Sequence, residues 1–225
     1  MKPALLSRQR THMLSAEAEL EFWERFNSAQ IRGSDNRGRL YASLEELMAV
    51  QEEEKAEYYR MNDEWWTAGG CGGDDDHAML GDERSEEDLQ ASRTFFDGWL
   101  RPRLEASLLA AASPLEGLPP IRAMDVGAGV GRVVRGVLGE RCALVHLVEA
   151  SAMWSERSKA YVCASACACT FDVARIEAYL PSLSSYELVW VQGCLQDLTD
   201  LDVIQTLTKV RCVRAYAFSS LCPMR

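Results

Sequence analysis

Residues 121–132 decide the fold, and they read Ile121-Arg122-Ala123-Met124-Asp125-Val126-Gly127-Ala128-Gly129-Val130-Gly131-Arg132. The apolar start predicts a strand, the alternate glycines predict a turn, and the apolar spacing of 133–138 predicts a helix. Glycines let the backbone turn tightly and approach a bulky ligand, while the helix N-terminus offers free N–H donors. The stretch therefore predicts a strand–turn–helix unit that holds a nucleotide-like ligand.

The spacing of the glycines distinguishes between ligands. A turn for dinucleotides reads G-x-G-x-x-G, whereas this chain reads D-x-G-x-G-x-G, with Asp125 two residues before Gly127. That pattern resembles the first motif of class I S-adenosylmethionine (SAM) methyltransferases. Such a site needs a second acid after the next strand, and Glu149 stands 18 positions after Gly131. The alternative is a tight strand–helix turn with an unrelated surface glutamate.

Length and composition limit the class of protein. A chain of 225 residues with 48% apolar residues predicts one domain with an appendage and a real core. No apolar window of 18 residues exists, so we expect no membrane span. The net charge of −10 argues against nucleic acid as the principal partner and suits a cationic substrate, although a soluble acidic surface explains it equally well.

The cysteines and aspartates give weaker signals. Eight irregularly placed cysteines predict reduced thiols, and Cys163, Cys167 and Cys169 lack a histidine at metal-ligand spacing. We therefore expect no metal site and take these thiols as small buried residues. The aspartates of 74–76 predict an acidic loop without the ligand spacing of a calcium site.

The remaining chain predicts helices first and then alternating strands and helices. Helices are expected at 15–26, from Ser43 to Tyr59, and from Ser85, where Ser85-Glu86-Glu87-Asp88 has the form of a capping box. After Glu149 we expect a helix at 152–159, a short strand near 161–168, a strand at 186–191 and a helix from Thr199. This alternation predicts an α/β fold with a doubly wound, mostly parallel sheet. We divide the chain into a helical N-terminal extension, 1–58, and a SAM-methyltransferase domain, 59–225.

Four motifs in order carry a family resemblance. Met79-Leu80-Gly81, then 125–132, then Trp190-Val191-Gln192, and finally Leu198-Thr199-Asp200 resemble the protein α-N-terminal methyltransferases. The likeness covers about 59–211. It implies methylation of the α-amino group of proteins that begin X-Pro-Lys, with SAM as cofactor, a protein N-terminus as partner, and work in the cytoplasm or nucleus.

The resemblance also implies roles for individual residues. Gly127 and Arg132 would contact the methionine end of SAM, Arg132 by pairing its carboxylate, and Glu149 would bind the ribose. The implied cofactor-binding set is Gly127, Gly129, Gly131, Arg132, Glu149, Ala150, Ser151, Arg175, Ile176 and Gln192. One of the adjacent Trp65 and Trp66 would shape the peptide channel. On the sequence alone, it is at least as good an explanation that one of the two tryptophans is buried and the other packs at the domain edge.

Two departures from the family pattern bear on activity. Asp197 stands where family members carry a His or Tyr, so we take Asp197 as the candidate proton acceptor; Gly193 replaces a frequent tryptophan. After Arg211 the family continues into further strands and a substrate-binding acid, whereas this chain offers only a short edge strand at 215–219. We therefore expect a sheet that lacks its last strands and weak or absent activity. The alternatives are a SAM enzyme for another amine or a small molecule, and a non-catalytic SAM-binding protein.

Overall fold

The structure is a computed structural model that describes residues 33–34, 38–67, 82–111, 119–179, 186–211 and 216–220. The described residues fall into two compact units. One holds the described residues up to Tyr59 together with Thr199–Leu201, and the other holds the described residues of Arg60–Leu198 and of Asp202–Cys222.

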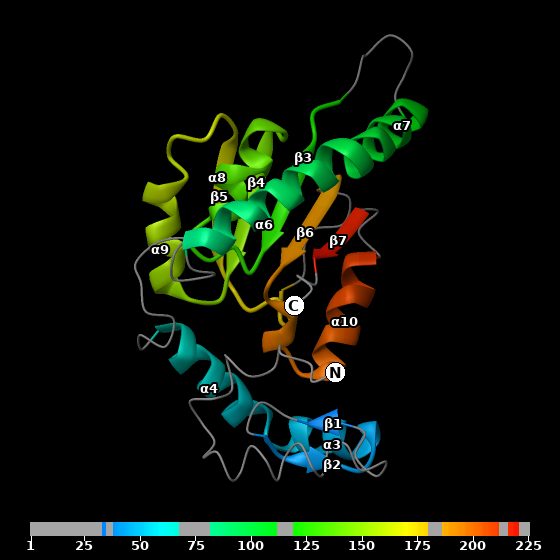
Figure 1. Cartoon of the computed structure of the whole chain (residues 1–225), viewed down its shortest axis with the longest axis vertical. Helices are drawn as coiled ribbons and strands as arrows, with labels where there is room; N and C mark the ends of the chain where they lie inside the picture. The colour runs from blue at the N-terminus through cyan, green and yellow to red at the C-terminus, as the bar shows by residue number, and fades with distance from the viewer. Residues whose placement is uncertain are drawn as a thin grey trace. The chain divides into compact units, whose positions relative to one another are not determined.

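The second unit is built on a parallel sheet of five strands in the order β5-β4-β3-β6-β7 (Figure 1). The central strand β3 (Arg122–Val126) pairs with β4 (Leu144–Glu149) on one side and with β6 (Leu188–Gln192) on the other. The outer strands are β5 (Ala168–Val173) and β7 (Tyr216–Ser220). The expected α/β fold with a parallel, doubly wound sheet is confirmed.

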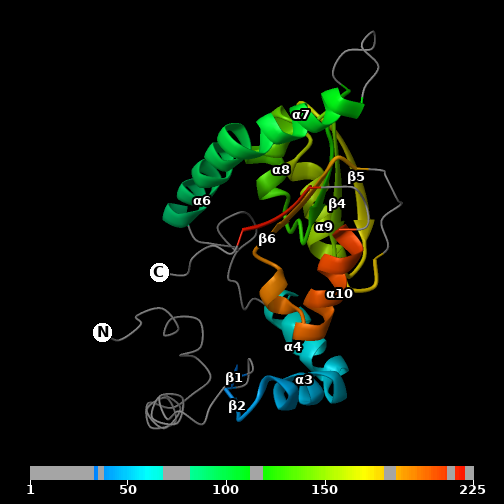
Figure 2. The same ribbon diagram turned by 90° about the vertical axis from the view of Figure 1, so that its right-hand side faces the viewer.

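Helices cover both faces of this sheet, as Figure 2 shows edge-on. On one face α6 (Asp82–Phe95), α7 (Arg101–Ala111) and α8 (Arg132–Gly136) pack on a core that includes Phe96, Leu104 and Trp190. On the other face α10 (Asp200–Arg211) sends Val210 into a second core of strand residues. The strands β3 and β6 are buried on both faces, which is why they read as continuous apolar runs.

A π-helical turn joins α6 to α7. This turn, η1 (Phe96–Leu100), buries Phe96 and Leu100, and Arg101–Ala111 continues as α7. Pro102 is the second residue of α7, directly after the π-helical turn, and the helix continues past it.

Further helical elements of this unit lie between the strands. After α8 comes a 3-10 turn, η2 (Leu138–Glu140), and between β4 and β5 lies α9 (Ala152–Tyr161). A second 3-10 turn, η3 (Leu195–Asp197), follows β6 and leads into α10. The helix expected at 152–159 is confirmed and is slightly longer.

The first unit contains a two-residue ladder and a helix. Strand β1 (Gly33–Ser34) pairs antiparallel with β2 (Leu40–Tyr41), and α3 (Leu44–Glu53) follows. Ser43 caps α3 by accepting the N–H of Glu46, as the sequence predicts. The single helix expected from Ser43 to Tyr59 is wrong in one respect, because α3 ends at Glu53 and a separate helix, α4 (Lys55–Thr67), begins at Lys55.

Two other expectations are corrected. The strand expected near 161–168 lies at 168–173, because Tyr161 still belongs to α9 and the small residues after it turn before the chain becomes extended. The helix expected from Ser85 begins at Asp82, so the four residues read as a capping box lie inside α6. The edge strand expected at 215–219 is confirmed as β7 at 216–220. The helix expected at 15–26, the aspartates of 74–76 and the motif 79–81 lie outside the described residues.

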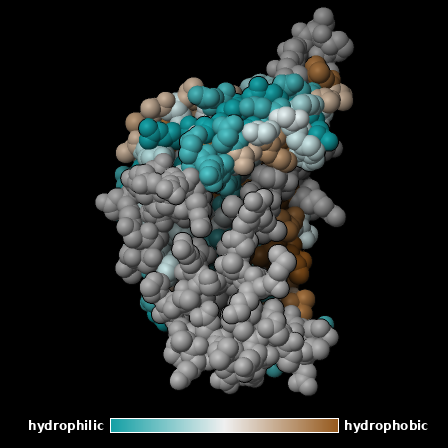
Figure 3. Space-filling view, in the orientation of Figure 1, coloured by the Kyte–Doolittle hydropathy of each residue, from teal (hydrophilic) through white to brown (hydrophobic). Residues whose placement is uncertain are grey.

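The hydropathy of the surface differs between the helices of the two faces. Figure 3 shows hydrophilic residues along α6 and hydrophobic residues where α10 lies, the helix that exposes Ile204 and Leu207. In the described part of the chain, no helix is long and apolar enough to cross a bilayer.

Candidate cofactor and substrate site

The glycine turn after β3 is shaped by close approaches that only glycine permits. Gly127, Gly129 and Gly131 all have positive φ, at 66°, 55° and 87°. A Cβ on Gly127 would lie 2.5 Å from Cβ of Cys194, and one on Gly131 would lie 2.4 Å from Cγ1 of Val162. The backbone of the turn is therefore tightly packed against Cys194 and Val162.

The carboxylate of Glu149 ties this turn to the next strand. One oxygen accepts the N–H of Gly129 at 2.9 Å and the other accepts the N–H of Ser151 at 2.8 Å. Burial raises the pKa of Glu149, and hydrogen bonds from the backbone of Ser151, Gly129 and Ala150 oppose that shift. Each carboxylate oxygen has two lone pairs, so both still have acceptor capacity for ribose hydroxyls.

Asp125 lies beneath the turn with an unsatisfied oxygen. Its side chain is buried, and Oδ2 has no hydrogen-bond partner among the described residues. Burial raises the pKa of Asp125 to about 7, with Arg132 lowering it and Glu149 raising it. A buried acceptor without a donor is costly, so this position fits a donor brought by a ligand.

Arg132 and Gln192 meet on one carboxylate, that of Asp88 in α6. Arg132 Nη2 donates to Oδ2 of Asp88 at 2.6 Å, and Gln192 Nε2 donates to the same oxygen at 2.7 Å. The amide oxygen of Gln192 accepts from Nε1 of Trp190 at 2.8 Å and from Oγ of Ser92 at 3.3 Å. The two predicted cofactor residues are thus brought together, although they come from different strand ends.

Arg132 is buried in this arrangement, with only 7% of the residue exposed. The resemblance predicts that its guanidinium pairs with the cofactor carboxylate. In the protein alone the guanidinium is paired with Asp88, and Nη1 also donates to the carbonyl of Ser85 at 3.4 Å. A guanidinium has five N–H donors, so a second carboxylate can still be bound without breaking the first pair.

The residues after β5 join the site through α4. Arg175 donates to Oδ1 of Asp63 at 2.7 Å and also pairs with Glu177. Ile176 packs against the core beneath β3 and β6. Ala150 is exposed, and Ser151 caps α9 by accepting the N–H of Trp154.

Asp197 and the second tryptophan are in contact. A side-chain hydrogen bond from Trp66 lowers the pKa of Asp197, but burial outweighs it and raises that pKa to about 7. Asn62 donates to the carbonyl of Asp197 at 2.9 Å, and Nε1 of Trp154 donates to the carbonyl of Trp66 at 2.9 Å. Trp65 is 43% exposed. Of the tryptophan pair, Trp66 therefore adjoins the candidate proton acceptor.

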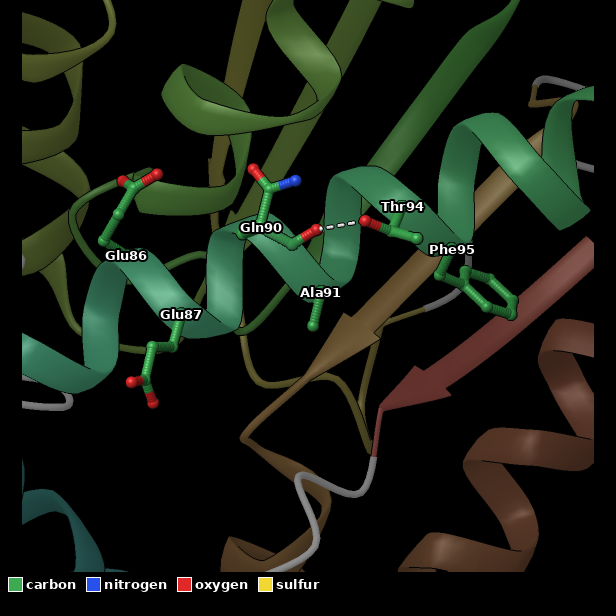
Figure 4. Close-up of a pocket in the computed structure, with 6 residues that line it drawn as sticks. All are labelled: Glu86, Glu87, Gln90, Ala91, Thr94 and Phe95. Atoms are coloured by element: carbon green, nitrogen blue, oxygen red, sulfur yellow. Dashed lines mark hydrogen bonds between the residues drawn. The ribbon is translucent and has the colours of Figure 1, made fainter.

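A separate pocket is lined by residues of α6. Glu86 and Gln90 point to one side of the helix and Glu87 and Ala91 to the other, while Thr94 bonds back to the carbonyl of Gln90 (Figure 4). None of the predicted site residues lines this pocket. This pocket is therefore not the predicted site.

Sequence reasoning missed four residues of the site: Asn62, Asp63, Asp88 and Ser92. Asp88 had been assigned to a helix cap, and its contact with Gln192 spans 104 residues of sequence. No group of three metal-ligating side chains occurs in the described ranges.

A parallel sheet in this order, with a glycine turn after its central strand and an acid after the neighbouring one, defines the class I SAM-methyltransferase fold. The profile of the family described as "AdoMet dependent proline di-methyltransferase" matches residues 53–219. The chain belongs to this family. The resemblance seen in the sequence is thereby confirmed, together with SAM as the cofactor of the family.

Curated relatives named alpha N-terminal protein methyltransferase 1 match part of this chain. The Schizosaccharomyces pombe protein is 36% identical over 93 residues, which are 41% of this chain and 41% of the relative. The Drosophila melanogaster protein is 33% identical over 94 residues, 40% of this chain and 33% of the relative. The matched region is thus about two fifths or less of the length of these relatives.

Solved structures agree in fold. A SAM-dependent methyltransferase from Leishmania major superposes with a TM-score of 0.65 at 22% identity, covering 84% of this chain and 73% of its own. Phosphoethanolamine N-methyltransferase 1 from Haemonchus contortus gives a TM-score of 0.51 at 18% identity, covering 74% and 33%. At these identities the likeness is one of fold.

Proposed function

We propose that this chain binds SAM and transfers methyl groups to the α-amino group of protein N-termini of the X-Pro-Lys type. One observation carries the proposal. Glu149 bridges the glycine turn and the start of α9, and its charge raises the pKa of Asp197, which supports a site shared by a cofactor acid and a candidate base. The names of the curated relatives support the substrate.

Each predicted residue has a physical task in this proposal. Glu149 would accept the ribose hydroxyls, Arg132 would pair the cofactor carboxylate, and the segment of Arg175 and Ile176 would border the adenine. Gly127, Gly129 and Gly131 would let the backbone approach the ligand, and Gln192 would lie beside it. The unsatisfied oxygen of Asp125 is what makes the residues fit a ligand that carries donors.

The substrate half of the site must prepare an amine. When bound, SAM supplies a methyl group on a cationic sulfur that leaves as a neutral thioether. An α-ammonium group must first lose its proton, and Asp197 accepts it, because a pKa of about 7 suits proton exchange with an amine near neutral pH. The hydrogen bond from Trp66 keeps that carboxylate oriented.

Acidic side chains around Asp197 favour a cationic substrate. Asp63, Glu177 and Glu149 all adjoin the site, and Arg175 is the cation that pairs with the first two. An N-terminal peptide with a free amine and a lysine brings the complementary charge. Work in the cytoplasm or nucleus stays a prediction from the family.

Calorimetric titration with SAM tests the cofactor half of the proposal. We expect the wild-type chain to bind SAM. We expect Gly127→Arg and Glu149→Ala each to abolish this binding. Glu140→Ala is the matched control, because Glu140 is an exposed glutamate in η2 whose side chain is 80% accessible. A folded wild-type chain that does not bind SAM contradicts the proposal.

A peptide assay tests the substrate half. A peptide that begins Ser-Pro-Lys should gain one to three methyl groups, and the same peptide with an acetylated N-terminus should gain none. Methylation of both peptides would assign the activity to a side chain. SAM binding without any methylation would favour the non-catalytic alternative.

A further inference from the structure

We propose that Asp88 is a positioning residue that sets Arg132 and Gln192 for the amino-acid tail of the cofactor. This inference rests on the proposed function and adds a residue to its site. Asp88 lies in the middle of α6, and its side chain is 9% exposed. Asp88 is not among the cofactor-binding residues that the family resemblance implies.

One carboxylate oxygen organises both partners. Oδ2 of Asp88 accepts from Arg132 at 2.6 Å and from Gln192 at 2.7 Å. Arg132 begins α8 directly after the glycine turn, and Gln192 ends β6. Asp88 therefore fixes the relative position of two groups that the backbone delivers separately.

The remaining contacts fix the orientation of the Gln192 amide and of the Arg132 guanidinium. Gln192 receives hydrogen bonds on Oε1 from Trp190 and Ser92, so its amide hydrogens must point toward Asp88. Ser92 is one helical turn beyond Asp88 and is 5% exposed, so α6 presents both contacts from one face. The opposite charges of Arg132 and Asp88 keep the guanidinium extended toward α6 and not free to rotate.

This geometry predicts that Asp88 matters for the tail of the cofactor and not for its nucleoside. Arg132 is the group proposed to pair the tail carboxylate, whereas the nucleoside is assigned to Glu149 and the segment after β5. A loss of positioning should then depend on whether the ligand carries the tail. A general structural role would weaken both kinds of ligand alike.

The test compares two ligands by calorimetry on the full chain. S-adenosylhomocysteine has the amino-acid tail, and 5′-methylthioadenosine, used up to millimolar concentration, lacks it. Asp88→Ala should raise the Kd of S-adenosylhomocysteine by roughly 10- to 100-fold, the range for lost charged hydrogen bonds, and that of 5′-methylthioadenosine by less than about 3-fold. Arg132→Ala should give the same signature, and the loss in the double variant should fall short of the sum of the two single losses.

Asp97→Ala is the matched control. Asp97 makes a similar pair with Arg141, at 2.6 Å, from the adjoining turn η1, without contact to Arg132 or Gln192. It should leave both Kd values unchanged. If Asp88→Ala does not fold, Asp88→Asn replaces it in the comparison, because asparagine keeps the shape of the side chain and one acceptor oxygen. Asp88→Asn should raise the Kd of S-adenosylhomocysteine by a smaller factor than Asp88→Ala, again with little effect on 5′-methylthioadenosine.

The outcomes separate the inference from the function on which it rests. Equal weakening of both ligands, or no weakening of either, overturns the role of Asp88. Failure of the folded wild type to bind either ligand overturns the proposed function itself.

Discussion

The packing behind the glycine turn predicts a strong coupling between Gly131 and Val162. Gly131 has φ 87°, and a Cβ there would lie 2.4 Å from Cγ1 of Val162 and 3.4 Å from Cδ2 of Leu147. A left-handed backbone costs an alanine roughly 1–2 kcal/mol, and the overlap adds about 1–3 kcal/mol. Gly131→Ala should therefore lower the free energy of unfolding by about 2–5 kcal/mol.

Val162→Ala should rescue part of that loss. Val162 is 3% exposed, and removing its two methyl groups alone costs about 2 kcal/mol with a further cavity cost. In the double variant the new methyl of residue 131 occupies the space that Cγ1 has left. The two losses should then fall short of additivity by about 1–3 kcal/mol.

Urea denaturation followed by far-UV circular dichroism measures all three variants. Gly98→Ala is the matched control, because Gly98 is helical and a Cβ there meets nothing within 4 Å. It should raise stability by about 0.5–1 kcal/mol. Losses that add within about 0.5 kcal/mol would refute the steric argument.

The other predictions concern ionisation in the site. Asp197→Asn should lower kcat by about 10²- to 10⁴-fold and remove the acid limb of the pH–rate profile. In the wild type the midpoint of that limb should lie near the Asp197 pKa of about 7. If the variant keeps the limb, Asp197 is not the base. Trp66→Phe removes a hydrogen bond that lowers the pKa of Asp197, so the limb should move to higher pH, and a shift to lower pH would contradict the contact. For Asp125, the native state keeps a proton between pH 3.8 and about 7 that the unfolded state has lost, so stability should fall as pH rises through that range. The loss is at most about 4 kcal/mol, and Asp125→Asn should not show it in thermal unfolding from pH 5 to 8; parallel curves for the two proteins would refute the assignment.

The central elements were predictable because their signals are local. The turn at 127–131 needs positive φ at three glycines, and such a need appears directly in the sequence. Glu149 could be identified because the helix and strand between it and the turn have nearly fixed lengths. Ser43 followed by Glu46 marked a helix start for the same local reason.

The missed features depend on tertiary contacts. Asp88 reads as one more acid in an acidic helix start, and only folding brings it to Arg132 and Gln192. The strand at 168–173 was displaced in the prediction because it is an outer strand with a largely exposed side-chain pattern, so its apolar signal is weak. The position of β5 is therefore determined more by its pairing with β4 than by its own amino-acid composition.

The strand order also has a consequence for how the protein folds. Every neighbour in the five-stranded sheet is parallel, so no pair can close through a tight hairpin. The pairs β3–β4 and β4–β5 close over one helical crossover each, whereas β6 must return to β3 from residue 188. Contacts so distant in sequence are entropically costly to make and slow to form. We therefore expect the half-sheet of β3, β4 and β5 to assemble first, and Gln192 to reach Asp88 only when β6 docks, so that the tail end of the site is completed last.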